Sequence, residues 1–258
     1  MKNINKPWAL ILLIVLVIAL AVISSLLQKN NEVEEITVTE KISPHMIFRI
    51  GPLVVTSTVI NTWIMISIIG IASYFIGKSF KVSPGLLQIA IEWFKQAIEN
   101  LICINVGSRD PSLFFPEIAS LALFIGCANL LGLIPGLDSP TPDINTPLAL
   151  ALIVLISVPY YGIRTHKLGG YLKHYVQPVF LMFPVEIASE IARTFSLTFR
   201  LFGNIFGEEI IVAILFMIAP FIVPVPVMLF GIFTGVLQAY IFTLLTCVYI
   251  GGAVKAHK

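Results

Sequence analysis

With 57% hydrophobic and only 12% charged residues, this chain of 258 residues is far more apolar than a soluble globular protein, in which about a quarter of the residues are charged. Its formal net charge of +2 is too small to indicate nucleic-acid binding. The three cysteines lack metal-ligand spacing, and the sequence contains no phosphate loop, dinucleotide fingerprint or nucleophile elbow, so we expect neither a cofactor nor a soluble catalytic domain.

Several apolar runs are long enough to cross a bilayer, which requires about 20 residues. In chain order they span residues 8–27, 54–76, 113–137, 147–163, 176–220 and 225–254. They predict an all-α integral membrane protein with five to six membrane helices. The last two runs exceed a perpendicular crossing of about 30 Å at 1.5 Å per residue. Pro220, Pro224 and Pro226 predict a helix break between them.

The first apolar run permits two interpretations. Lys2 and Lys6 before it and small residues after it are compatible with a cleaved signal peptide, whereas the length of the run favours a retained helix. In both cases the acidic segment that follows lies outside the cell. We therefore divide the chain into an N-terminal apolar and external acidic region, 1–53, and a membrane domain, 54–258.

An amphipathic helix is expected between the second and third membrane runs, within residues 83–106. Apolar residues recur there at helical spacing, at Leu86, Ile89, Ala90, Trp93, Ala97 and Leu101. Polar residues occupy the opposite face, at Gln88, Glu92, Lys95, Gln96 and Glu99. This pattern predicts a surface helix that lies at the membrane interface or packs on the rim of the bundle.

Positive charges gather in alternate connections between the runs. One set comprises Lys2, Lys6, Lys78, Lys81, Arg109, Arg164, Lys167, Lys173, Lys255 and Lys258. The opposite connections are acidic or neutral, apart from Lys29, Lys41 and Arg49 in a long segment. The positive-inside rule therefore predicts that both termini are cytoplasmic.

A stripe of polar residues marks the fifth apolar run. Its members step by three or four residues and so form one line on a helix: Glu186, Glu190, Arg193, Ser196, Arg200, Asn204 and Glu208. Glu209 lies about 100° from this line. In a bilayer such a line must face protein or water. Near its cytoplasmic end, Glu186, Glu190 and Arg193 could alternatively form local ion pairs.

Arg200 is the deepest charge of the stripe. A charge near the bilayer centre costs at least about 2.5–3.5 kcal/mol, and such residues usually mark ion pathways. The guanidinium keeps its charge at any accessible pH. The nearest acid at helical spacing is two turns away, so we expect the partner of Arg200 to come from another subunit.

The residues around Arg200 closely resemble the signature of subunit a of F-type ATP synthases, with the run SLTFRLFGNIFGEE at 196–209. Residues 237–249 resemble the last helix of that family, and residues 129–135 and 140–145 look like its middle hairpin. The resemblance extends from about His45 to the C-terminus.

This resemblance implies a non-catalytic, ion-translocating stator subunit in a bacterial plasma membrane. Its expected partners are a ring of c subunits, against which the two long helices tilt, and the b subunits of the peripheral stalk. Arg200 matches the essential arginine, which keeps a passing c-subunit carboxylate ionised and separates two half-channels. The transported ion is H⁺ or Na⁺, because selectivity lies mainly in the ring.

The resemblance also assigns roles to other residues. Glu209 matches the acid of the outer half-channel, Gln238 matches the glutamine that sits near the arginine, and Glu186 matches an acid near the inner exit. By their chemistry, Asn204 and Gln238 can line a wet path or form hydrogen bonds with Arg200. Asp143 and Asn145 fall at the channel entrance. Each role has a structural alternative: a glutamate at a polar interface, helix–helix hydrogen bonding, an ion pair, or a loop acid.

One position departs from the family pattern. Some relatives place a histidine or glutamate two turns before the glutamine of the last helix, where this chain has Gly231. We interpret Glu208, next to Glu209, as the residue that supplies the second group.

Two other function classes remain open on the sequence alone. A self-contained transporter or channel would normally bring internal repeats, and none is found. A structural membrane scaffold would leave the deep arginine and the amides unexplained.

Overall fold

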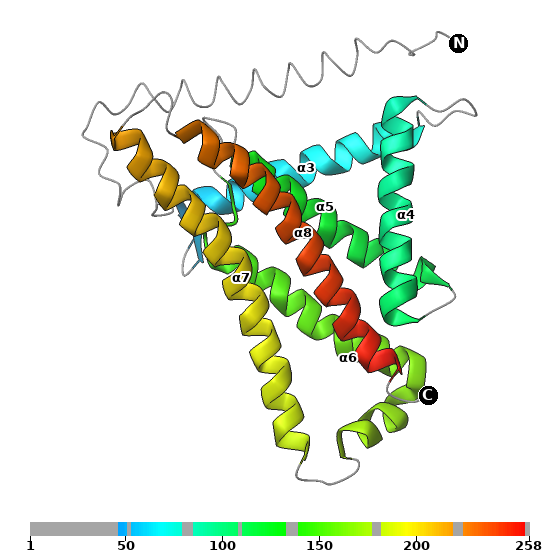
Figure 1. The fold of residues 1–258 in the computed structure, drawn as a ribbon. Helices are drawn as coiled ribbons and strands as arrows, with labels where there is room; N and C mark the ends of the chain where they lie inside the picture. The colour runs from blue at the N-terminus through cyan, green and yellow to red at the C-terminus, as the bar shows by residue number, and fades with distance from the viewer. Residues whose placement is uncertain are drawn as a thin grey trace.

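The computed structural model describes residues 46–50, 53–78, 85–107, 110–132, 139–176, 182–218 and 224–255. The elements are β1 (Met46–Ile50), β2 (Leu53–Thr56), α3 (Ser57–Lys78), α4 (Leu86–Val106), η1 (Pro111–Leu113), α5 (Phe115–Leu131), α6 (Asn145–Val176), α7 (Met182–Ile218) and α8 (Pro224–Lys255) (Figure 1). The predicted all-α membrane fold is confirmed, with the addition of a short β-hairpin. The first apolar run lies outside the described residues.

The hairpin was not anticipated from the sequence. Strands β1 and β2 pair antiparallel, with Ile50 opposite Leu53, and a Gly-Pro pair joins them, which is a typical turn signal. Because β2 takes residues 53–56, the second membrane helix begins at Ser57, later than the predicted start at residue 54.

Two helices differ in length from the predicted runs. Helix α5 starts only at Phe115, because a 3₁₀ turn precedes it, and the Asp110 carboxylate caps that turn by accepting from the Ser112 amide at 3.1 Å. Helix α6 is longer than expected and continues through Pro159 to Val176. The predicted break between the long helices is confirmed, since α7 ends at Ile218 and α8 begins at Pro224.

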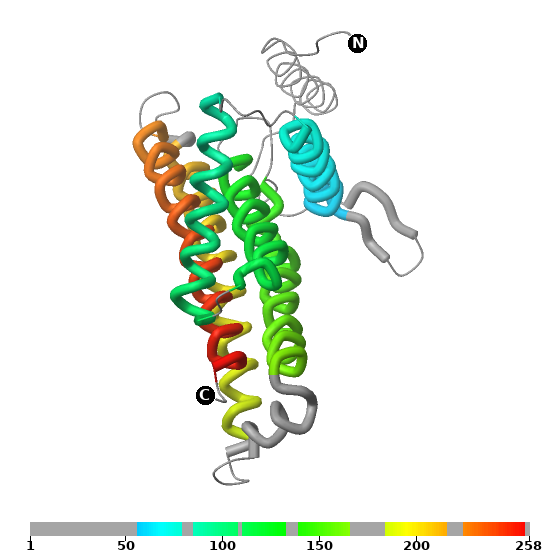
Figure 2. The backbone as a smooth tube through the Cα atoms, turned by 90° about the vertical axis from the view of Figure 1, so that its right-hand side faces the viewer, coloured from blue at the N-terminus to red at the C-terminus, as the bar shows by residue number. Residues whose placement is uncertain are grey.

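Helix α8 is the centre of the bundle and contacts α4, α5, α6 and α7 (Figures 1 and 2). Two apolar clusters hold these helices together. One joins α4, α5, α6 and α8 around Ile102, Ile118 and Ile250, all of which are fully buried. The other joins α5, α6, α7 and α8 around Ile125, Leu201 and Phe242.

Helix α8 approaches two neighbours very closely, at two glycines. A Cβ at Gly251 would overlap the Asn105 carbonyl oxygen of α4, and a Cβ at Gly235 would lie 3.1 Å from the Asn129 Cβ of α5. Both positions therefore require glycine or a backbone shift. The contact at Gly251 holds the C-terminal part of α8 against α4, and the contact at Gly235 holds a more central part of α8 against α5.

Helices α3 and α4 lie on the outside of the bundle. In α3 only Met65 is buried, and Figure 2 shows this helix beside the bundle rather than within it. Of the two placements predicted for the amphipathic helix, α4 adopts the one on the rim, where it packs through Ile98 and Ile102. The first turns of its predicted apolar face point outward, with Trp93 72% exposed, whereas Leu101 at the end of that face packs against the cluster.

By length and apolar composition, three helical segments of the described residues could cross a membrane, Ser57–Lys78, Asn145–Thr165 and Pro224–Lys255. Helix α5 is a shorter apolar helix, Phe115–Leu131. Helix α7 carries the polar stripe along 37 residues of continuous helix.

Candidate functional site

Arg200 points away from the rest of the bundle. The face of α7 that packs on α6 and α8 carries Leu197 and Leu201, which are 2% and 0% exposed. Arg200, one residue before Leu201, is exposed, as are Ser196 and Gly203 beside it. Within the described part of the chain, no carboxylate lies at ion-pair distance from Arg200. The guanidinium is therefore available to a partner beyond the described residues.

The predicted polar line does not face one environment along its whole length. Ser196 and Arg200 are exposed, whereas Glu186, Arg193 and Glu208 are half-buried. The polar side chains of this line are therefore exposed near Arg200 and partly buried toward each end of α7. Arg200 is set between two groups of polar side chains, one toward each end of α7.

The group toward the N-terminal end of α7 is internally satisfied. Arg193 forms an ion pair with Glu186, with 3.8 Å between Nη2 and Oε1, and its guanidinium lies 5.5 Å from the centre of the Tyr249 ring. The Thr194 hydroxyl donates to the Glu190 carbonyl oxygen at 3.0 Å. These residues confirm that an ion pair forms at this end of the stripe.

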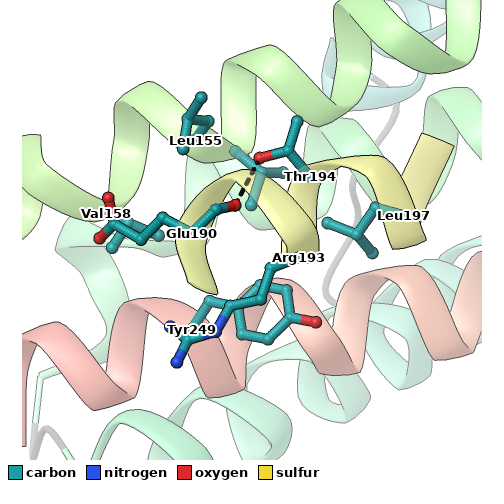
Figure 3. A pocket seen from close by; sticks show the side chains of 8 residues that line it. Leu155, Val158, Glu190, Arg193, Thr194, Leu197 and Tyr249 are labelled. Atoms are coloured by element: carbon teal, nitrogen blue, oxygen red, sulfur yellow. Dashed lines mark hydrogen bonds between the residues drawn. The ribbon is translucent and has the colours of Figure 1, made fainter. Parts of the chain in front are cut away.

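A small pocket opens between α6, α7 and α8 at the same level (Figure 3). Its lining comprises Val154, Leu155, Val158, Glu190, Arg193, Thr194, Leu197 and Tyr249. Figure 3 shows Arg193 extended over the Tyr249 ring on one side of α7, with Glu190 reaching toward Val158 on the other. The pocket, called the inner pocket below, combines an apolar wall with one acid and one guanidinium.

The group toward the C-terminal end of α7 meets α8 at Gly231. The Glu208 carboxylate occupies the space beside this glycine, where any Cβ would overlap it. Glu209, the next residue, is half-buried. The Glu208 carboxylate of α7 therefore takes up the space that a side chain at position 231 of α8 would occupy, while the role expected of Glu208 from the sequence stays a prediction.

Three buried amide side chains have an atom without a hydrogen-bond partner among the residues that the structure describes. Gln238 of α8 is only 5% exposed and its Nε2 is one of these atoms, and the Nδ2 of Asn204 on α7 is another. On α5, Asn129 donates through Nδ2 to the Gly235 carbonyl oxygen at 3.1 Å, while its Oδ1 is left without a partner. Buried amides of this kind are normally satisfied by protein or water.

Asn129 was missed as a site residue in the sequence analysis, which used it only as part of a motif. An asparagine inside the apolar run of α5 was the available signal. Its 4% exposure and its bond to Gly235 place it at the contact between α5 and α8.

The two predicted entrance residues lie together at the N-terminus of α6. Asp143 Oδ1 accepts from the Asn145 backbone amide at 3.1 Å and from its side-chain amide at 2.8 Å. Asp143 Oδ2 accepts from the Thr58 hydroxyl of α3 at 2.8 Å. These bonds give Asp143 a structural function, since it caps α6 and ties α3 to it.

The sequence of this chain is similar to a known family and to characterised relatives. A family model described as ATP synthase A chain matches residues 59–251. ATP synthase subunit a 2 of Bradyrhizobium sp. is 40% identical over 209 residues, covering 81% of this chain and 93% of the relative.

Two further relatives agree with this match. ATP synthase subunit a of Moorella thermoacetica is 38% identical over 216 residues, covering 84% of this chain and 99% of the relative. The protein of the same name from Legionella pneumophila is 39% identical over 215 residues, covering 83% and 93%. Since the family model and these relatives span most of the chain, it belongs to the family of ATP synthase subunit a.

Proposed function

We propose that the chain is the ion-translocating stator subunit a of a rotary ATP synthase, in which Arg200 faces the ring of c subunits and separates two half-channels. The observation that carries the proposal is the exposed Arg200, without an acidic partner among the described residues and flanked by acids toward both ends of α7. Family membership supports the c ring and the b subunits as partners.

In this proposal Arg200 acts on a carboxylate of the ring. A positive charge nearby favours the ionised form of a carboxylate, so the ring releases its ion on one side of Arg200 and binds another on the other side. Moving one charge through 100 mV supplies about 2.3 kcal/mol, which drives the rotation. The chain itself performs no bond chemistry on ATP.

The two polar groups of α7 are assigned to the two half-channels. Glu208, Glu209, Asn204 and Gln238 line the outer one. Glu186 and the inner pocket belong to the inner one, and Asp143 and Asn145 lie toward the entrance. Their positions on opposite sides of Arg200 along α7 and α8 support this division.

The bacterial sources of the relatives support a bacterial plasma membrane, and the positive-inside pattern supports a cytoplasmic C-terminus. The ion is H⁺ or Na⁺.

The decisive experiment replaces Arg200 in the assembled complex in membrane vesicles. We expect Arg200→Ala to lose ATP-driven ion pumping and to change the passive ion leak after removal of the catalytic head. Arg200→Lys keeps the charge but loses the planar fork of donors, so we expect it to be impaired as well.

Lys95→Ala is the matched control, because Lys95 is an exposed cation on α4 that forms an ion pair with Glu99 of the same helix. Unchanged pumping by Arg200→Ala in an assembled complex would overturn the assignment. Coupled transport by the purified chain without the ring would instead favour a stand-alone transporter.

A further inference from the structure

The contact between α5 and α8 is built around one asparagine and one glycine. Asn129 of α5 is 4% exposed, and its Nδ2 donates to the Gly235 carbonyl oxygen of α8 at 3.1 Å. A Cβ at Gly235 would lie 3.1 Å from the Asn129 Cβ, so the absence of a side chain at Gly235 lets the two helices come this close. A hydrogen bond and a tight apolar contact therefore join the helices at the same point.

This contact fixes α8 in two directions. A hydrogen bond requires a donor–acceptor distance of about 2.7–3.2 Å, which limits how far α8 can slide past Asn129. Rotation is limited as well, because a slip by one residue, which turns a helix by about 100°, would bring Thr234 or Val236 to the place of Gly235. Both carry branched side chains, for which so close an approach leaves no room. Asn129 thus sets both the height and the rotation of α8 at this turn.

A second contact between the same helices gives the same register. A Cβ at Gly126 of α5 would lie 3.9 Å from the Cβ of Ala239 on α8. Gly126 precedes Asn129 by three residues, whereas Ala239 follows Gly235 by four, so the two helices run antiparallel here. Gln238 lies between Gly235 and Ala239 in the sequence, in the turn of α8 that Asn129 holds.

Gln238 is also level with Arg200 of α7. Glu208 of α7 occupies the space beside Gly231 of α8, which places these two residues at one height. Helices α7 and α8 contact each other and run in opposite directions (Figure 1). Seven residues along α8 from Gly231 is Gln238, and seven residues back along α7 from Glu208 is Leu201. Because both helices rise about 1.5 Å per residue, Gln238 comes to the height of Leu201, the residue next to Arg200.

We propose that Asn129 is a positioning residue of the ion path, which holds Gly235 and so keeps the Gln238 amide at the height of Arg200. The inference rests on the proposed function, in which Gln238 lines the outer half-channel. The Nε2 of Gln238 has no hydrogen-bond partner among the described residues, so within this part of the chain that atom does not fix the side chain. The position of the amide then depends on the backbone of α8, which Asn129 holds in place.

The first test replaces Asn129 in the assembled complex in membrane vesicles. Leucine has a similar volume but no donor, so Asn129→Leu removes the bond to Gly235. We expect ATP-driven ion pumping to fall about three- to tenfold, since the loss should not exceed that of removing the Gln238 amide itself. Unchanged pumping would overturn the proposal.

Thr246→Val is the matched control for Asn129→Leu. Thr246 is fully buried on α8, but its hydroxyl donates to the Phe242 carbonyl oxygen of the same helix at 2.9 Å. We expect pumping by Thr246→Val to stay at the wild-type level.

The second test separates positioning from a general loss of packing. If Asn129 acts through Gln238, the double variant Asn129→Leu/Gln238→Leu should pump as Gln238→Leu alone does. Losses that multiply in the double variant would mean that the two residues act independently. That result would contradict the positioning role even if each single variant were impaired.

The third test replaces the hydrogen bond by a covalent link one turn away. The Cβ separation of 3.9 Å at Gly126 and Ala239 lies within the range of about 3.5–4.5 Å that disulfides require. Gly126→Cys and Ala239→Cys are combined in a background in which the three native cysteines are replaced by alanine. With Asn129 intact, we expect the oxidised form to pump as well as the reduced form. With Asn129→Leu, oxidation should restore pumping, and a reductant should reverse the gain.

Two results of the third test would count against the proposal. A disulfide that stops pumping with Asn129 intact would mean that α5 and α8 must slide past each other during transport. A disulfide that forms in Asn129→Leu without restoring pumping would mean that the Asn129 amide has a chemical function of its own. Mass spectrometry of the linked peptides verifies the bond, and where none forms, the double variant of the second test decides.

These outcomes are separable from those of the stator proposal. Normal pumping by Arg200→Ala would defeat the stator proposal whatever the Asn129 variants show. Loss of pumping in Arg200→Ala together with unchanged pumping in Asn129→Leu would defeat only the inference about Asn129.

Discussion

The two ends of the polar stripe on α7 differ in how their side chains are satisfied. At the end toward the N-terminus of α7, called the inner end here because it carries the inner pocket, Arg193 has both Glu186 and the Tyr249 ring as partners. At the outer end, toward the C-terminus of α7, the described residues supply no partner for the amide nitrogen of Asn204, and the same is true of Gln238 on the neighbouring α8. Both ends carry two acids, but only the inner end also carries a cation, Arg193, so the two ends differ in charge as well as in hydrogen bonding.

This difference indicates where water must enter the bundle. An amide that is transferred from water without a hydrogen bond costs about 1–3 kcal/mol by protein mutational data, and inside a bilayer no solvent compensates for it. Polar cavities with several unsatisfied groups hold water. We therefore infer that the outer end is the wetter end and that the inner end is sealed by its own contacts up to the inner pocket.

The largest effect on ion flux among these replacements is expected from Gln238→Leu. If the amide serves only the ion path, its loss should lower ion flux about tenfold, which corresponds to about 1.4 kcal/mol in the barrier. The same change removes a buried donor without a partner, so the free energy of unfolding in detergent should stay the same or rise. Vesicle flux and chemical unfolding measure the two effects.

Thr243→Val on the same helix is the control for Gln238→Leu. Thr243 is equally buried, but its hydroxyl donates to the Ala239 carbonyl oxygen at 2.7 Å. We expect little change in flux from this replacement. A loss of stability in Gln238→Leu would show that the amide is an interhelical bond, and the contrast between the two ends would then disappear.

The largest loss of stability is expected from Gly231→Ala, which forces the Glu208 carboxylate out of its place. Overpacking of this kind typically costs about 1–3 kcal/mol. In the background of Glu208→Ala the same replacement should cost almost nothing, because the space is then free. A double-mutant cycle on the free energy of unfolding measures this coupling.

Gly70→Ala is the matched control for Gly231→Ala, since a Cβ at Gly70 meets nothing within 4 Å. It should stabilise the helix by about 0.5–1 kcal/mol. Equal costs for Gly231→Ala with and without Glu208 would mean that the carboxylate does not occupy this space.

The smallest effect is expected at the inner end, from Arg193→Gln. The side chains of Arg193 and Glu186 are 41% and 36% exposed, and ion pairs this accessible contribute about 0.2–1 kcal/mol. We expect thermal stability to change little and the change to shrink at high salt. A large loss of thermal stability that is independent of salt would show that the pair of Arg193 and Glu186 contributes more to folding than an accessible ion pair does.

The local pattern of the sequence predicted the helices that carry the site. The spacing of the stripe from Glu186 to Glu208 requires one continuous helix, and α7 provides it. The prolines after Ile218 predicted where α7 stops, because a proline cannot continue the backbone hydrogen bonds of a helix. The hairpin before Ser57 was missed because its two short strands precede an apolar run that dominates the hydropathy.

Contacts between distant residues could not be predicted in this way. Asn129 bonds to a residue 106 positions away, and Glu117 to one 40 positions away. A lone polar residue in an apolar run shows that a partner is needed but not which helix supplies it. The outward direction of Arg200 is likewise fixed by the packing of Leu197 and Leu201, which depends on where α6 and α8 lie.

The two close approaches of α8 have a mechanical consequence. Gly235 lies against Asn129 and Gly251 lies against Asn105, at heights about 24 Å apart along the helix at 1.5 Å per residue. A rod clamped at two heights resists bending far better than one clamped at a single height. A lateral force on the exposed face of α7 is therefore transmitted to α8, and from α8 to α4 and α5, which resist the displacement of α8.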